Sequence, residues 1–195
     1  MKNILICGDS FAIDYKKYNV EIPHKGWPNY LADKHNVTNL ATPGVGQWKI
    51  WKQVESANLE NFDIVLVSIG SPNRVHCRTH PVHKQGMFME SDLAWMDIDR
   101  SSWLNKALTT AKNWFVYFYD QQYQNELYEM ITDKIINHIK HKKYILVGHN
   151  ESRTLDTDSE NFINCNDLWN NERGKVNHYN HKAALQIVKR IEKHL

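Results

Sequence analysis

Two side chains of this sequence have the chemistry needed for acyl transfer. Ser10 follows an apolar run over residues 4–7 and the dipeptide Gly-Asp, and His178 precedes the last helical pattern of the chain. Transfer of an acyl group from an ester needs a hydroxyl nucleophile and a base that accepts its proton. Ser10 can supply the hydroxyl group, and His178 can act as the base.

The same reaction needs hydrogen-bond donors for the negative charge that develops on the carbonyl oxygen. Gly44 lies in the loop TPGVG, where a glycine lets a backbone N–H come close to a substrate. Asn73 ends the sequence GSPN after an apolar run, and its side-chain amide can donate a second hydrogen bond. Together with the backbone N–H of Ser10, these groups form a candidate oxyanion hole.

Each of these residues also has a purely structural interpretation. Asp9 and Ser10 are favoured residue types at the start of a helix. Gly44 and Asn73 are typical turn residues, and His178 can simply precede a helix. Convergence of His178 with Ser10 in the folded chain is what separates the catalytic interpretation from the structural one.

Five segments have the composition of buried strands. Apolar runs bounded by glycine occupy residues 4–7, 62–70 and 144–148, and weaker candidates occupy residues 36–40 and 162–165. Helical patterns lie between them, at residues 27–35, 47–59, 103–111, 122–139 and 181–195. This alternation predicts a parallel sheet with helices on both faces. Ligands of such sheets bind at the carboxyl ends of the strands, so Ser10, Gly44 and Asn73 should meet at one edge.

Residues 71–100 form a long connection that does not fit this alternation, and long loops in compact domains are usually lids or binding loops. Aromatic residues are frequent in this connection and after it. The helical spacing of those after the connection predicts that most of them belong to the core that covers the sheet. Trp95 differs, because a tryptophan in a loop can stack on a sugar ring or line an acyl pocket.

Histidines in the connection offer a second chemical interpretation. His76 and His80 are four residues apart, and Cys77 and His83 are close by, so that soft ligands suited to zinc are gathered in one segment. However, Pro81 opposes a helix that would present them together, and no Cys-x-x-Cys pair accompanies them. A solvated or substrate-facing loop is the favoured interpretation.

Length and composition indicate a single domain over residues 1–195. The sequence is 42% hydrophobic and 24% charged, which is typical of a globular protein, and its formal net charge of +2 does not indicate binding to nucleic acid. The N-terminal apolar run lacks the long apolar region and cleavage site of a signal peptide. No run reaches the roughly 18 residues of a membrane span. We therefore expect a soluble protein of the cytoplasm or another intracellular compartment.

The four segments that contain these candidate residues resemble, in their order and position, the four sequence blocks of the SGNH, or GDSL-type, hydrolase family. The family is named for the Ser, Gly, Asn and His of these blocks. The sequence GDS that ends at Ser10 matches the first block, and NLATPG with Gly44 matches the second. The third block, Gly-x-Asn in the family, is one residue longer here and ends at Asn73. His178, followed by the final helix, matches the fourth.

This resemblance implies a three-layer α/β/α sandwich of the flavodoxin type with a mainly parallel sheet of about five strands. It implies an ester hydrolase that forms an acyl-enzyme on Ser10, with His178 as the base. Ser10, Gly44 and Asn73 would donate to the oxyanion. The family implies neither a metal nor an organic cofactor.

Substrates of the family range over acetylated sugars, lipids and acyl thioesters. The short chain favours a small acyl ester, such as an O-acetyl group on a carbohydrate. We expect Asp9 and Trp95 to contact this substrate. The sequence does not indicate an oligomeric state.

One departure from the family pattern concerns the base. The family usually has an aspartate three residues before the histidine, where it orients the imidazole, and this chain has Lys175 there. Either His178 works in a dyad that a backbone carbonyl orients, or Asp167 or Glu172 replaces the aspartate. An alternative function follows from the same departure: a catalytically weak or inactive domain that binds a glycan or a protein partner.

Overall fold

A sheet of five parallel strands forms the centre of the fold, in the order β2-β1-β3-β4-β5. The computed structural model describes residues 1–18, 24–99, 106–149, 159–172 and 178–195. The strands are β1 (Asn3–Cys7), β2 (Asn36–Asn39), β3 (Ile64–Ser68), β4 (Lys143–Gly148) and β5 (Phe162–Asn164). This is the flavodoxin-like order, which confirms the predicted fold class.

Successive residues of the central strands face opposite sides of the sheet. Ile4 and Ile6 of β1 belong to one hydrophobic core, whereas Leu5 and Cys7 belong to another. All of β3 is buried. A strand that is covered on both faces needs apolar residues at every position, and this is why the short apolar runs of the sequence identify the sheet correctly.

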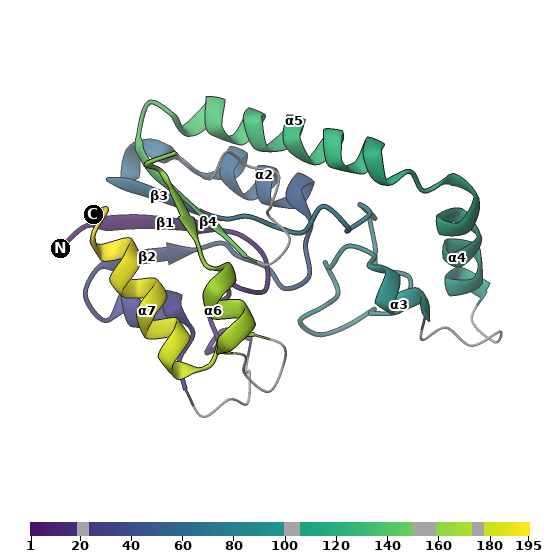
Figure 1. The fold of residues 1–195 in the computed structure, drawn as a ribbon, viewed down its shortest axis with the longest axis horizontal. Coiled ribbons are helices and arrows are strands. Elements are labelled where there is room, and N and C mark those ends of the chain that lie inside the picture. Colours follow the sequence, from purple (N-terminus) through teal and green to yellow (C-terminus); the bar gives the residue numbers. More distant parts are fainter. Residues whose placement is uncertain (19–23, 100–105, 150–158, 173–177) are drawn as a thin grey trace.

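Helices cover both faces of the sheet (Figure 1). α1 (Trp27–Ala32) and α7 (His181–Glu192) pack together on one face, and α2 (Gln47–Ser56) and α5 (Gln121–Ile139) pack together on the other. The sequence did not predict α6 (Asn166–Asn171), which adds two apolar side chains to the core under α1 and α7. Among the described residues, no helix is long and apolar enough to cross a membrane.

A buried carboxylate anchors the long connection after β3. Asp92 accepts hydrogen bonds from the backbone N–H groups of Gly46 (2.7 Å) and Cys77 (3.1 Å), and it forms an ion pair with Lys49 (2.8 Å). Burial of a carboxylate is costly without such partners. The connection is therefore fixed to the N-terminal end of α2. It also contains a short helix, α3 (Trp95–Asp99), where the sequence predicts an irregular loop.

The aromatic helix after this connection does not cover the sheet. α4 (Lys106–Phe118) packs on α3 instead, and the predicted helix start at residue 103 lies outside the described residues. Tyr117 and Phe118 are 74% and 73% exposed, so they do not belong to the core that the sequence predicts for most of these aromatic residues. Phe115 is buried, but in a small separate cluster under α3. Helical spacing shows which side chains share a face, but it does not show what that face contacts.

The close approach of β1 and β3 depends on Gly8. A methyl group at this position would lie 2.5 Å from Cβ of Ser68 and 3.1 Å from its carbonyl oxygen. We expect Gly8→Ala to lower the free energy of unfolding by roughly 1–3 kcal/mol, the usual cost of overpacking. Urea unfolding measures this change.

Gly70→Ala is the matched control for this substitution. The added methyl group at Gly70 would lie 3.0 Å from Cδ1 of Ile50, the end of a flexible side chain that can shift. We expect a smaller loss of stability than for Gly8→Ala. Equal losses in the two variants would contradict the importance of the β1–β3 contact.

Candidate active site

One cleft of about 1170 Å³ lies at the carboxyl edge of the sheet. It is lined by Ser10 after β1, Gly44 after β2, Asn73 after β3 and His178 before α7. The structure thus brings together all four residues that the sequence selects. Their chemical roles stay predictions.

Aromatic side chains form much of the remaining wall of the cleft. They are Phe11, Phe88, Trp95, Phe115, Tyr119 and Trp169. Trp95 is 48% exposed, so a ligand can reach its ring. Asp9 also lines the cleft, but it is only 3% exposed and its carboxylate binds protein groups, which does not favour direct contact with a substrate.

Ser10 lies in a tight turn that Asp9 holds in place. The Asp9 carboxylate accepts a hydrogen bond from the N–H of Phe11 (3.0 Å), and the Asp9 carbonyl accepts one from the N–H of Ala12 (3.0 Å). Residues 9–18 contain no helix. Asp9 therefore stabilises a turn, and the interpretation of Ser10 as a helix-capping residue does not hold.

Gly44 occupies a turn that excludes other residue types. Its φ angle is +72°, and a Cβ atom there would lie 2.7 Å from Cβ of Ser91. Its carbonyl oxygen accepts a hydrogen bond from the N–H of Asp92 (2.8 Å), so the connection after β3 packs directly on this turn. The tight turn is itself part of the cleft wall, and the two interpretations of Gly44 are compatible.

Asn73 is an exposed residue of the cleft wall. Its side-chain oxygen accepts a hydrogen bond from Nε2 of Gln121 (3.0 Å), and its backbone N–H donates to the hydroxyl group of Ser71 (3.1 Å). The first contact turns the NH₂ end of the amide away from Gln121. Asn73 is thus a turn residue with an oriented side chain.

His178 packs beside the turn that carries Ser10. Its ring centroid lies 5.2 Å from that of Phe11, the residue that follows Ser10. Lys175, which stands at the position of the family's aspartate, lies outside the described residues. The described part of the site thus has its candidate nucleophile and candidate base on neighbouring segments.

Cations hold the two carboxylates that could replace this aspartate. Asp167 forms an ion pair with Arg190 (2.5 Å). Glu172 binds Lys182 and accepts a hydrogen bond from Nδ2 of Asn180 (2.9 Å). These contacts tie both carboxylates to α7 and its N-cap, and we assign neither of them the orienting role.

A buried chain of hydrogen bonds joins the two halves of the site. The Ser68 hydroxyl group, at the end of β3, contacts the Asp9 carboxylate and Nε2 of His149 (2.9 Å). Nδ1 of His149 lies 2.6 Å from the Tyr179 hydroxyl group. None of the four side chains is more than 3% exposed. Since Asp9 and Tyr179 are the sequence neighbours of the candidate nucleophile and base, the chain fixes both segments to the end of the sheet.

This buried chain of hydrogen bonds can be complete with its donors pointing in either direction. With Asp9 ionised, Tyr179 donates to Nδ1 of His149, Nε2–H donates to Ser68, and Ser68 donates to the carboxylate. A proton on Asp9 reverses each of these bonds, and Tyr179 then donates to the carbonyl oxygen of Cys165 (3.5 Å). Both arrangements keep the imidazole neutral, and neither leaves a buried donor without an acceptor.

Burial shifts the pKa values of the two titratable side chains in this hydrogen-bonded chain in opposite directions. It lowers the pKa of His149 to about 3, and the nearby His178 acts in the same direction. It raises the pKa of Asp9 to about 6, although the N–H of Phe11 and the charge of Arg74 oppose this rise. At neutral pH the chain therefore contains a neutral imidazole and an ionised carboxylate.

Sequence reasoning did not select Ser68 or His149. Ser68 lies inside an apolar run, where a small polar residue is easily taken for a tolerated substitution. His149 directly follows Gly148, the last residue of β4. The rule that selects residues just after each strand applies to His149 as well, and this was the available signal.

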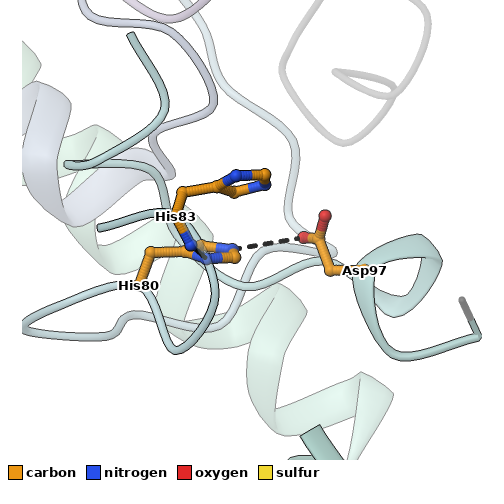
Figure 2. Close-up of side chains that lie close together, drawn as sticks. All are labelled: His80, His83 and Asp97. Carbon is orange, nitrogen blue, oxygen red and sulfur yellow. Dashed lines mark hydrogen bonds and ion pairs between the residues drawn. The ribbon is translucent and has the colours of Figure 1, made fainter. Parts of the chain in front are cut away.

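Figure 2 shows a second group of titratable side chains, in the connection after β3. His80, His83 and Asp97 have potential ligand atoms within 4.8 Å of one another, the one such group found in the ranges that the structure describes. His76, which the sequence groups with these histidines, lies apart from them, with Nδ1 3.3 Å from Asp92.

The hydrogen bonds of His80 do not suit a metal ligand. Its Nδ1 accepts hydrogen bonds from the backbone N–H groups of Val82 (3.2 Å) and His83 (3.0 Å). The neutral ring must then carry its proton on Nε2, which faces Asp97 at 3.7 Å. A metal-bound imidazole instead donates a hydrogen bond through its other nitrogen. The geometry fits a contact between His80 and Asp97 that holds α3 on the connection.

No protein-family model matches the chain, and no curated protein matches its sequence. Among solved structures, the chain is similar to a possible lipase from Chitinophaga pinensis, with 13% sequence identity and a TM-score of 0.35. The similarity covers 75% of this chain and 48% of that protein, so this chain spans about half of its length. A likeness of this strength does not extend to an activity or a substrate.

The opposed pKa shifts in the buried chain predict how stability depends on pH. Between about pH 4 and 6, native Asp9 holds a proton that the unfolded chain lacks, and unfolded His149 holds one that the native chain lacks. Their effects on the pH dependence of unfolding cancel there. Asp9→Asn removes the contribution of Asp9 and leaves that of His149. As the pH falls from 6 to 4, the free energy of unfolding of this variant should therefore decrease, relative to the wild type, by about 1.4 kcal/mol per pH unit.

His149→Gln is the complementary variant. It leaves the raised pKa of Asp9, whose contribution to stability is present below pH 4 and is lost as pH rises toward 6. Relative to the wild type, its unfolding free energy should therefore rise as pH falls from 6 to 4. Urea unfolding at several pH values measures both slopes. Slopes of the same sign in the two variants would contradict the opposed shifts.

Proposed function

We propose that this protein is a serine ester hydrolase in which Ser10 is the nucleophile. The supporting observation is the convergence of Ser10, Gly44, Asn73 and His178 on one cleft, from four separate segments of the chain. The packing of Phe11 on the His178 ring further supports it, because Phe11 directly follows Ser10. A set of structural turn residues would not need to share one cavity.

In the proposed reaction, His178 accepts the proton of the Ser10 hydroxyl group as Oγ attacks the acyl carbon. The backbone N–H groups of Ser10 and Gly44 and the side-chain amide of Asn73 donate to the resulting oxyanion. His178 then gives its proton to the leaving alcohol, which leaves an acyl-enzyme. A water molecule, deprotonated by His178, hydrolyses this ester and restores Ser10.

The base in this mechanism works as a dyad. Phe11 packs against the ring of His178, and the neighbouring Tyr179 is fixed through His149. These contacts hold the segment, but they do not select the imidazole tautomer as an aspartate does. Loss of the orienting acid can lower the rate by orders of magnitude, so we expect slow turnover.

The cleft wall suits an acyl ester of a carbohydrate. Exposed aromatic rings such as Trp95 offer flat surfaces on which a sugar can stack. The volume of the cleft leaves room for a sugar residue beside a small acyl group. Removal of an O-acetyl or similar group is the specific reaction that we propose.

A second serine–histidine pair, Ser68 and His149, is hydrogen-bonded in the structure but is a poor candidate for the reaction. Ser68 is 0% exposed, and only His149 of the pair lines the cleft. Ser68 also donates to Asp9 when that carboxylate is ionised. A substrate in the cleft does not reach its oxygen in this structure.

Hydrolysis of p-nitrophenyl acetate tests the proposal. We expect Ser10→Ala and His178→Ala each to lower the rate by at least about 100-fold, because each removes a reacting group. A fluorophosphonate probe should label Ser10, and mass spectrometry of the labelled peptide identifies the site. Circular dichroism checks that each variant is folded.

Ser68→Ala is the matched control in these experiments. It should retain the labelling of Ser10, although loss of its hydrogen bonds lowers stability. Labelling of Ser68 would move the nucleophile to the buried pair. If the wild type shows no hydrolysis above Ser10→Ala and no label, the enzyme proposal fails and the alternative of a binding domain for a glycan or protein partner takes its place.

A further inference from the structure

Arg74 brings a permanent positive charge to the turn of Gly44. Its Nη1 lies 3.6 Å from the position that a Cβ atom of Gly44 would occupy, and it donates a hydrogen bond to the carbonyl oxygen of Asp92 (3.3 Å). Arg74 is half-buried and lines the cleft. The guanidinium group is therefore held at the cleft, beside the predicted oxyanion hole.

This charge has no ion-pair partner in the described ranges. The ion pairs found there do not include Arg74. Its hydrogen bond to Asp92 uses one of the several N–H donors of a guanidinium group. Asp9, the carboxylate that lines the cleft, is buried and is already hydrogen-bonded to Ser68 and Phe11. A guanidinium group with donors left over is well suited to bind a carboxylate or phosphate through two parallel hydrogen bonds.

We propose that Arg74 binds an anionic group of the substrate, so that the cleft selects acyl esters that carry a carboxylate or phosphate next to the ester. This inference rests on the proposed ester hydrolysis and specifies its substrate class. The guanidinium group lies beside the turn of Gly44, whose N–H is a proposed oxyanion donor, so the reacting carbonyl and an anionic group of the same molecule can be bound together. An acylated acidic sugar has this combination of groups.

Two other roles of Arg74 make different predictions. If its guanidinium group stabilised the oxyanion itself, the loss of Arg74 would slow neutral and anionic esters equally. If Arg74 only held the connection through Asp92, its loss would lower stability without changing the preference between substrates. The ratio of rates for a charged and an uncharged ester therefore separates the proposed role from these two, and the stability of the variant separates the two from each other.

The experiment compares matched pairs of esters. Mono-4-nitrophenyl glutarate and 4-nitrophenyl pentanoate have acyl chains of equal length and differ in a terminal carboxylate. 4-Acetoxybenzoate and its methyl ester place the same difference on the alcohol side. The value of kcat/KM is measured for each ester at one ionic strength, because salt weakens exposed charge interactions.

We expect the wild type to prefer the anionic member of at least one pair, and that pair shows on which side of the ester the anion lies. Arg74→Gln should lower kcat/KM for this ester by about 10- to 100-fold, the usual effect of a lost charged hydrogen bond, and change its neutral partner by less than about 3-fold. Arg74→Lys should recover part of the loss. Arg78→Gln is the matched control, since Arg78 is exposed in the same connection and does not line the cleft.

Binding gives a readout that does not depend on turnover. Isothermal titration calorimetry with mono-4-nitrophenyl glutarate and with 4-acetoxybenzoate, in the Ser10→Ala background, should show weaker binding of the preferred anion when Arg74→Gln is added. Binding that depends on Arg74 without hydrolysis by the wild type would overturn the ester hydrolase and support the anion site. Neutral esters hydrolysed through Ser10, with no anion preference in either pair, would overturn the anion site alone. An equal loss on both members of a pair would also overturn it.

Discussion

The end of β3 buries a polar side chain, and much of the candidate site follows from this constraint. Ser68 is fully buried, so its hydroxyl group depends on Asp9 and His149 for its hydrogen bonds. A buried polar group left without a partner costs about 1–3 kcal/mol. Gly8 provides the space for the Ser68 side chain, because any larger residue would collide with its Cβ atom. The glycine that precedes Asp9-Ser10 thus serves the neighbouring strand as well as the turn.

The same hydrogen bonds position both halves of the proposed catalytic pair. Asp9 shapes the turn of Ser10, and Tyr179 fixes the backbone next to His178, so the two segments share one anchor at the end of the sheet. In hydrolases with a serine–histidine–aspartate triad, the aspartate contacts the catalytic histidine directly. The buried chain of hydrogen bonds includes Tyr179, one residue away from His178. It can therefore hold the histidine segment in position, as the aspartate does, but it does not bring a negative charge to the imidazole.

The centre of the fold could be predicted from the sequence because the runs of β1, β3 and β4 are largely buried and a glycine bounds each of them. β2 and β5 gave weaker patterns, since β2 has no buried residue and β5 is short. Ser10, Gly44 and Asn73 could be selected because they follow strands, and Gly44 because only glycine fits its turn. His149 obeys the same rule, but a single histidine after a strand gives no sign that it is buried. The role of Tyr117 and Phe118 could not be predicted, since it depends on where α4 packs and not on its own periodicity.

The connection after β3 is part of the cleft wall, and its anchor, Asp92, holds the turn of Gly44 in the proposed oxyanion hole. Asp92 binds the Gly46 N–H through its carboxylate, the Gly44 carbonyl through its N–H, and Arg74 through its carbonyl oxygen. One residue therefore holds the glycine turn, the start of α2 and the cation of the cleft in a single arrangement. Since Gly44 would act on the reacting carbonyl and Arg74 on the rest of the substrate, the rate of the reaction and the choice of substrate share one structural support. A rearrangement of this connection would then change both properties together, whereas a mobile lid would change access alone.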